Sequence, residues 1–269
     1  MTDEVDCDSH GRAGQTFVCQ HIAELSARVF NSERPTPDEP WPDAWCERCA
    51  EVLERCGGEW NDEAEAFAAI QVMCSTCYLE RRMLIDDDGP EAEAEPPFPF
   101  LYRCGSCDQT HTGLPTWGAD APLTWREASP AEQAAGRLGS DLCEVGGHFF
   151  IRGLIEIPIL GSRQRMLWGV WASLSETSVA HVVEHWSDPE RGRDQHYFGW
   201  VMTQLPLRLY PDTLQLKSHV HPRAPGKRPL LLLEPTEHPL AVDQRTGISM
   251  ARAEELATLL LAGQGGARA

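Results

Sequence analysis

Two stretches of the same design decide the fold of the N-terminal part: WCERCAEVLE at residues 45–54 and VMCSTCYLER at residues 72–81. In each, an aromatic or apolar residue precedes a CxxC turn, and a helical pattern follows. A CxxC turn points two thiolates at one tetrahedral metal position, and a second turn a couple of dozen residues away completes the site. We therefore expect one four-sulfur zinc site made of Cys46, Cys49, Cys74 and Cys77.

The segment DCDSHGRAGQTFVCQHIAEL at residues 6–25 precedes them. It holds a CxxH turn, an alternating strand ending in TFVC, and a CxH motif that enters a helix, and it resembles a treble-clef-like zinc knuckle. The ligands expected for a second zinc ion are Cys7, His10, Cys19 and His21. The alternative for the two histidines is that one caps a helix and the other lies in a turn.

A module of this size has a marginal core, and zinc can supply on the order of 10 kcal/mol of folding free energy. Between the CxxC turns, an amphipathic stretch at residues 59–72 offers Trp60, Phe67 and Ile70 to that core. A thioredoxin-like redox role is excluded because the βαβ pattern that it requires is absent. Thiolate-rich sites suit zinc or iron, and we expect zinc.

The segment DDDGPEAEAEPPFP at residues 86–99 is acidic and proline-rich, so it predicts a linker between two domains, residues 1–85 and residues 100–262. A disordered tail is expected at residues 263–269. The first 99 residues hold 7 arginines, no lysine and 23 acidic residues, a net charge of −16. Nucleic acid is therefore excluded as a partner. The acidic surface is interpreted first as a means of solubility, and the alternative is that its field steers a basic protein partner.

The N-terminus has no secretory signal pattern, so we expect a cytoplasmic protein, where CxxC spacing indicates metal or redox chemistry. The sequence contains no run of eighteen apolar residues, so it does not predict a membrane span. Nor does the sequence contain a phosphate loop, a dinucleotide fingerprint or a GxSxG elbow.

The second domain is expected to be α+β, with a mainly antiparallel sheet and flanking helices. Branched, aromatic and alternating residues predict strands at residues 148–159, 166–174, 197–205, 214–220 and 228–234. Helices are expected at residues 130–138, 176–186 and 249–262. The short connection at residues 161–165 is typical of a hairpin.

YRCGSCDQTHTGLP at residues 102–115 opens this domain with a third possible zinc site. Its ligands would be Cys104, Cys107, His111 and Cys143. Alternatively, Cys143 is a core residue and His111 a loop residue. The total expected is thus two or three zinc ions.

The motif order CxxC, GLP, SDLC, FFIRG, WGVWASLS and RPLLLLEPTEHPLAVDQRTGIS resembles the bacterial domain of unknown function family 2199, over residues 102–262. The resemblance implies a fold unit and no established activity.

Two further sets of residues are candidates for chemistry. His181, Glu184 and His185 match the inverted zinc-peptidase motif HxxEH, although no third ligand is identifiable, and an exposed helix face is the alternative. A ligand pocket is predicted from Arg152, Glu156, His238, Asp243 and Arg245, with a capping and salt-bridge network as the alternative. The leading hypothesis is a non-enzymatic protein that binds a protein or small ligand, and the rival is a metal-dependent hydrolase.

Overall fold

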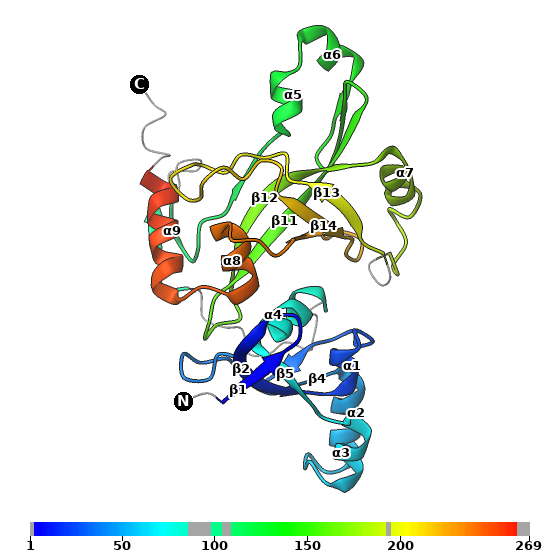
Figure 1. Ribbon diagram of the computed structural model, residues 1–269, viewed down its shortest axis with the longest axis vertical. Helices are drawn as coiled ribbons and strands as arrows, with labels where there is room; N and C mark the ends of the chain where they lie inside the picture. Colours follow the sequence, from blue (N-terminus) through cyan, green and yellow to red (C-terminus); the bar gives the residue numbers. More distant parts are fainter. Residues whose placement is uncertain (1–2, 86–97, 104–108, 192–194, 263–269) are drawn as a thin grey trace. The chain divides into compact units, whose positions relative to one another are not determined.

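A computed structural model describes residues 3–85, 98–103, 109–191 and 195–262. Most of the predicted linker and all of the predicted tail lie outside these residues. The chain divides into two compact units (Figure 1). Unit 1 comprises Met1–Pro97, Pro158–Arg165 and Arg245–Met250, and unit 2 comprises Phe98–Ile157, Met166–Gln244 and Ala251–Ala269. No helix among the described residues is long and apolar enough to cross a membrane.

Unit 1 is built on a small sheet whose central strand is β2 (Gly11–Val18). β1 (Glu4–Cys7) forms an antiparallel hairpin with it, and β5 (Gln71–Cys74) pairs antiparallel to its second half. β4 (Ala44–Trp45) pairs parallel to β2 at Val18, and β3 (Asn31–Ser32) pairs with β4. Segments far apart in the sequence therefore meet along one strand.

Three helices described in unit 1 follow directly on strands. α1 (Gln20–Ala23) follows β2, α2 (Glu47–Arg55) follows β4, and α4 (Ser75–Leu84) follows β5, each with a cysteine at its N-cap. α3 (Asp62–Ala68) is capped by Asn61, whose side chain accepts hydrogen bonds from two backbone N–H groups.

The core of unit 1 combines apolar side chains with cysteines. It includes Val18, Ile22, Phe30, Ala44, Tyr78 and Leu79, together with Cys19, Cys46 and Cys49. The expectation that Trp60 and Ile70 enter this core is wrong: they are 38% and 45% exposed, and only Phe67 packs against it. For Ile70 the cause is the end of α3, because Ala69 adopts a left-handed conformation (φ 44°) that stops the helix before Ile70, while Trp60 precedes Asn61, the N-cap of this helix.

Unit 2 is centred on two long strands, β11 (His148–Pro158) and β12 (Arg165–Leu174), which pair with each other. The sequence predicted the ends of both strands to within one residue. The sheet continues from β11 through β15 (Leu230–Leu233), β14 (Lys217–His221) and β13 (Tyr197–Trp200), all shorter than expected. The other side carries β10 (Leu142–Val145) and β9 (Arg137–Leu138), and β8 (Trp117–Gly118) pairs with β12. Most pairs are antiparallel, while β11–β15 and β12–β8 are parallel.

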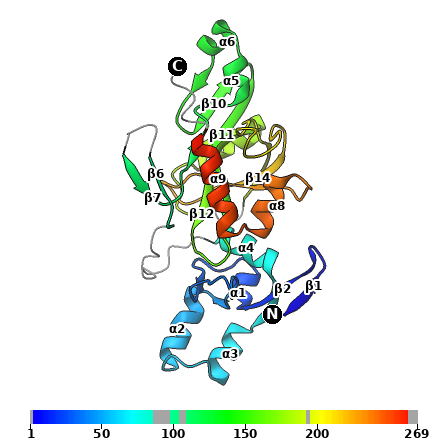
Figure 2. The same cartoon turned by 90° about the vertical axis from the view of Figure 1, so that its left-hand side faces the viewer.

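Helices and a separate hairpin surround this sheet. β6 (Leu101–Arg103) and β7 (Thr110–Thr112) form a two-stranded sheet of their own, set apart in Figure 2. The helices of unit 2 are α5 (Leu123–Glu127), α6 (Pro130–Ala135), α7 (Glu176–Glu184), α8 (Pro239–Thr246) and α9 (Met250–Ala262). α8 was not predicted. Its signal is Pro239 as the first helical residue after His238, whose ring accepts the N–H of Leu240 at 3.2 Å.

The core of unit 2 is filled by aromatic and branched side chains. Trp168, Trp171, Phe150 and Ile155 are each at most 2% exposed. The α+β class predicted from the sequence is confirmed in this unit and in unit 1.

Candidate metal centres

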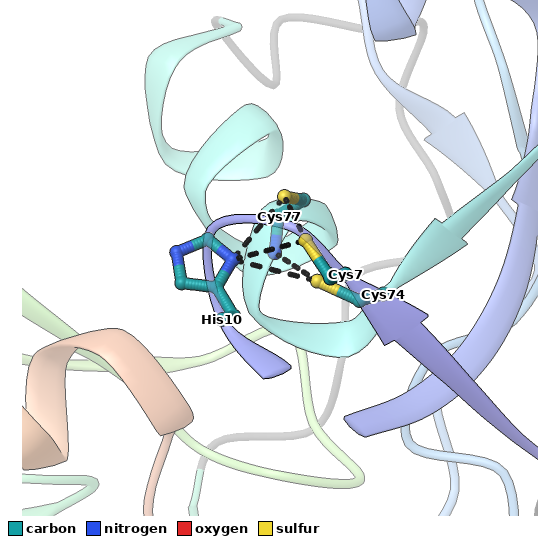
Figure 3. Close-up of side chains that lie close together, drawn as sticks. All are labelled: Cys7, His10, Cys74 and Cys77. Atoms are coloured by element: carbon teal, nitrogen blue, oxygen red, sulfur yellow. Dashed lines mark hydrogen bonds between the residues drawn. The ribbon is translucent and has the colours of Figure 1, made fainter. Parts of the chain in front are cut away.

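The first cluster of ligands, here called the outer cluster, lies where the β1–β2 turn meets the start of α4 (Figure 3). Its residues are Cys7, His10, Cys74 and Cys77. Cys7 ends β1, and His10 closes the following turn by donating its N–H to the Cys7 carbonyl at 3.2 Å. Gly11 then takes a left-handed conformation (φ 69°), which glycine adopts without a steric penalty. β5 delivers Cys74 to the N-cap of α4, so Cys77 lies in the first helical turn.

The distances in the outer cluster are those of a tetrahedral zinc site. Bonds of about 2.3 Å to sulfur and about 2.0 Å to nitrogen give tetrahedron edges of about 3.8 Å between sulfurs and about 3.5 Å between sulfur and nitrogen. His10 Nδ1 lies 3.7, 3.5 and 3.4 Å from the Sγ atoms of Cys7, Cys74 and Cys77. The Sγ atoms of Cys7 and Cys77 are 3.9 Å apart. One ion can therefore contact all four atoms.

The second cluster, here called the inner cluster, is fully buried and contains Cys19, His21, Cys46 and Cys49. Cys19 and Cys46 are the N-caps of α1 and α2, while His21 and Cys49 lie in these helices. The Nδ1 atom of His21 lies 3.5 Å from the Sγ of Cys46 and 3.4 Å from that of Cys49. The His21 ring also packs on Phe67, with centroids 5.3 Å apart. These edges again match a tetrahedral three-sulfur, one-nitrogen site.

Helix N-termini stabilise the thiolates in both clusters. The Cys46 and Cys74 sulfurs accept the backbone N–H groups of Cys49 and Cys77, at 3.4 and 3.3 Å. The positive end of a helix favours a thiolate at this position, and such thiolates are also better metal ligands.

The pKa values of the cysteines show how closely the sulfurs are packed. The hydrogen bond between Cys19 and Cys46 lowers the pKa of the first thiol and raises that of the second. Burial, with the charge of Cys46, raises the pKa of Cys49 to about 11. Burial also raises the pKa of Cys77, while a backbone hydrogen bond from Ser9 lowers that of Cys7. A cation among the sulfurs would favour the thiolate form of each cysteine.

The grouping of the ligands differs from the sequence prediction. Cys46 and Cys49 do not share a site with Cys74 and Cys77, because each CxxC turn instead joins one cysteine–histidine pair. The reason is β2, whose eight residues in extended conformation span roughly 25 Å. Residues before and after such a strand cannot reach the same ion. The result is a nested order, in which the outer cluster takes the first and last pairs and the inner cluster takes the two pairs between them.

The third predicted zinc site is only partly within the described residues. Cys104 and Cys107 lie outside them. His111 is on β7 and stacks on Tyr102, with ring centroids 5.6 Å apart. Cys143 is on β10, packed with Phe150 and Trp171, and burial raises the pKa of its thiol to about 11. This site stays a prediction.

The HxxEH residues lie at the end of α7 beside a cavity of about 230 Å³. His181 and His185 stack with centroids 4.2 Å apart, and both line the cavity, whereas Glu184 is exposed and does not. The Nδ1 of His181 lies 2.8 Å from the hydroxyl of Tyr197, and the Nδ1 of His185 lies 3.0 Å from the His181 carbonyl. Within the described part of the chain, no third ligand joins the two histidines in a metal-binding group.

The residues of the predicted ligand pocket have separate partners. Glu156 is 2.6 Å from Arg223, and Asp243 accepts a hydrogen bond from the Tyr210 hydroxyl at 2.9 Å. The guanidinium of Arg152 lies 6.0 Å from the centroid of the Trp171 ring, and the ring of His238 accepts a backbone hydrogen bond in the first turn of α8. Arg245 is in the last turn of α8. These contacts are of the capping and ion-pair kind, and the pocket stays a prediction.

Comparison with known proteins places the chain in a family. No curated protein and no solved structure matches it. The model of a family described as uncharacterized proteins conserved in bacteria (DUF2199) matches residues 103–248, which is more than half of the chain. The family resemblance expected from the motif order is thereby confirmed, and the chain belongs to the DUF2199 family.

Proposed function

We propose that two zinc ions hold unit 1 together and that unit 1 binds a basic protein partner in the cytoplasm. The observation that carries the first half is the pair of closed Cys3His clusters. One ion would be held by Cys7, His10, Cys74 and Cys77, and the other by Cys19, His21, Cys46 and Cys49.

Closed clusters support a structural role for the metal. A catalytic zinc ion keeps one position open for water or substrate, whereas here four protein atoms are available to each ion. The inner cluster is also part of the core of unit 1, since Cys19, Cys46 and Cys49 pack with Val18 and Ile22. Zinc in such a position would contribute directly to the folding free energy.

Charge supports the second half of the proposal. The described residues 3–85 carry 7 basic and 17 acidic side chains, and a zinc ion with three thiolate ligands adds further negative charge. A field of one sign attracts a partner of the opposite sign and speeds its association.

The metal content is measured by elemental analysis and native mass spectrometry of the purified full chain. Two zinc ions per chain are expected from unit 1, with a third if Cys104, Cys107, His111 and Cys143 hold metal, and a chain that folds without metal would refute the structural role. For the partner, cross-linking in the source bacterium followed by reconstitution with purified components should give a basic protein whose affinity falls steeply with salt. An acidic partner, or an affinity that does not depend on salt, would contradict the proposal.

The rival hydrolase has one observation in its favour, the cavity lined by His181 and His185. Against it stands the exposed position of Glu184, outside the cavity where a general base would act. Replacing both histidines by alanine separates the two proposals. The zinc content stays unchanged if the protein is a binding protein, and falls by one ion per chain if this pair holds a catalytic zinc.

A further inference from the structure

Unit 1 carries a groove, here called the aromatic groove, that neither zinc cluster uses. It has a volume of about 470 Å³, which is within the range of pockets that hold a small molecule. Its principal lining residues are Phe17, Asp43, Trp45, Trp60, Glu65 and Ile70. They come from β2, β4, α3 and the segments next to them, so the groove is assembled by the fold.

Aromatic rings form the walls of the groove and remain accessible to a ligand. Trp45 and Trp60 meet nearly at right angles (78°) with centroids 5.9 Å apart, which gives the groove two differently oriented indole surfaces. Phe17 and Trp60 are 37% and 38% exposed, and Ile70 is 45% exposed. Exposed apolar residues are ordinarily scattered singly over a protein surface. Several exposed aromatic and apolar side chains gathered around one groove are instead a feature of binding sites.

Two carboxylates accompany the rings. Asp43 is oriented by the backbone N–H of Phe17, which donates to its Oδ1 at 3.2 Å, and Glu65 lines the groove from α3. No basic side chain is among the described residues that line it. A neutral apolar ligand would desolvate both carboxylates without compensation, whereas a cation would pair with them and with the negative faces of the rings.

We propose that the aromatic groove binds the side chain of an arginine of the partner protein. This inference rests on the proposed function, and it names the place and the chemistry of recognition. A guanidinium group is planar, stacks on indole rings and pairs with carboxylates through several N–H donors. Its methylene stem is suited to the apolar contacts of Phe17 and Ile70.

The test uses the full chain labelled with ¹⁵N at tryptophan, so that each indole N–H gives one resonance. The probe is a short peptide with one arginine between alanines, and its control is the same peptide with citrulline, the neutral isostere of arginine. We expect the resonances of Trp45 and Trp60, assigned from tryptophan-to-phenylalanine variants, to shift with the arginine peptide only. Trp60→Ala should weaken binding about fivefold, the equivalent of one cation–π contact.

Matched variants test the charge. Glu65→Gln should weaken binding about twofold to threefold at low salt. Glu63→Gln removes the same charge from the same helix outside the groove lining and should change the affinity less. The unshifted resonances of the other tryptophans report that each variant is folded, and Trp60→Phe, which keeps a ring, should lose less than Trp60→Ala.

Three results would overturn the inference: equal binding of the citrulline peptide, shifts confined to other tryptophans, or no shift at all. They are distinguishable from a failure of the proposed function. If a basic partner binds the wild-type protein with salt-dependent affinity and Trp60→Ala leaves that affinity unchanged, the groove is refuted and the binding function stands. If no basic partner binds while the arginine peptide shifts Trp45 and Trp60, the groove stands and the partner is refuted.

Discussion

The nested grouping of the outer and inner clusters predicts an outcome that double variants measure directly. Cys49→Ser combined with Cys77→Ser disrupts both clusters, because one residue belongs to the inner cluster and the other to the outer cluster. Cys7→Ser combined with Cys77→Ser removes the same number of thiols from the outer cluster alone. We expect the first variant to lose two zinc ions per chain relative to the wild-type protein and the second to lose one.

The size of the effect follows from the number of ligands. The binding free energy of structural zinc in zinc-finger peptides is about 10–16 kcal/mol. If the four ligands contribute equally, each metal–ligand bond contributes about 3–4 kcal/mol. At about 1.4 kcal/mol for each tenfold change, losing one thiolate weakens a site by roughly two to three orders of magnitude. A competing chelator that leaves the wild-type protein fully loaded can therefore empty a site that lacks one ligand.

The assay is native mass spectrometry after equilibration with such a chelator, with the single variants Cys49→Ser and Cys77→Ser as references. If the two CxxC turns instead shared one site, Cys49 and Cys77 would bind the same ion. The two double variants would then show the reverse pattern of zinc loss. Loss of only one zinc ion by the Cys49→Ser/Cys77→Ser protein would refute the nested clusters. If each of the two double variants loses two ions, the clusters are nested and the inner cluster depends on the outer one.

Three other properties should follow from the structure. Chelators should remove zinc in two phases, the outer cluster first because three of its ligands are partly exposed, and Cys7→Ser should accelerate the fast phase but not the slow one in an absorbance assay of released zinc. Burial lowers the pKa of His221 to about 4, so protonation of the unfolded chain should reduce the free energy of unfolding as the pH falls from 6.5 to 4, by up to about 1.4 kcal/mol per pH unit. Urea titrations should show a shallower loss in His221→Gln, and an equal loss would exclude this cause. Glu156→Ala should cost about 3–5 kcal/mol in the same titrations, because it leaves the charge of Arg223 without its buried partner, and a cost below 1 kcal/mol would contradict this.

The sequence identified all eight cluster residues but not their grouping. The spacing of CxxC turns is local information, whereas the grouping depends on which ends of the strands meet. A signal was nonetheless present, since the residues before Cys19 alternate as a strand does. An extended segment at this place separates Cys7 and His10 from Cys19 and His21.

In unit 2 the two long strands were predictable because each contains ten or eleven residues rich in branched and aromatic side chains. The shorter strands β13, β14 and β15 were found with less accurate ends. Their limits are set by pairing partners, which no local pattern specifies. The exposure of Trp60 and Ile70 escaped prediction for a similar reason, since the helical spacing of the sequence runs from residue 59 to residue 72 although the helix begins after Trp60 and stops before Ile70.

The zinc clusters and the aromatic groove are connected through the chain itself. Trp45 directly precedes Cys46, and Phe17 stands two residues before Cys19, so both groove residues are next to ligands of the inner cluster. The backbone at Val18 and Ala44 is also paired between β2 and β4. An ion that fixes Cys19 and Cys46 therefore fixes the spacing of Phe17 and Trp45. Zinc would act on binding without touching the ligand, because it orders the strands from which the groove is made.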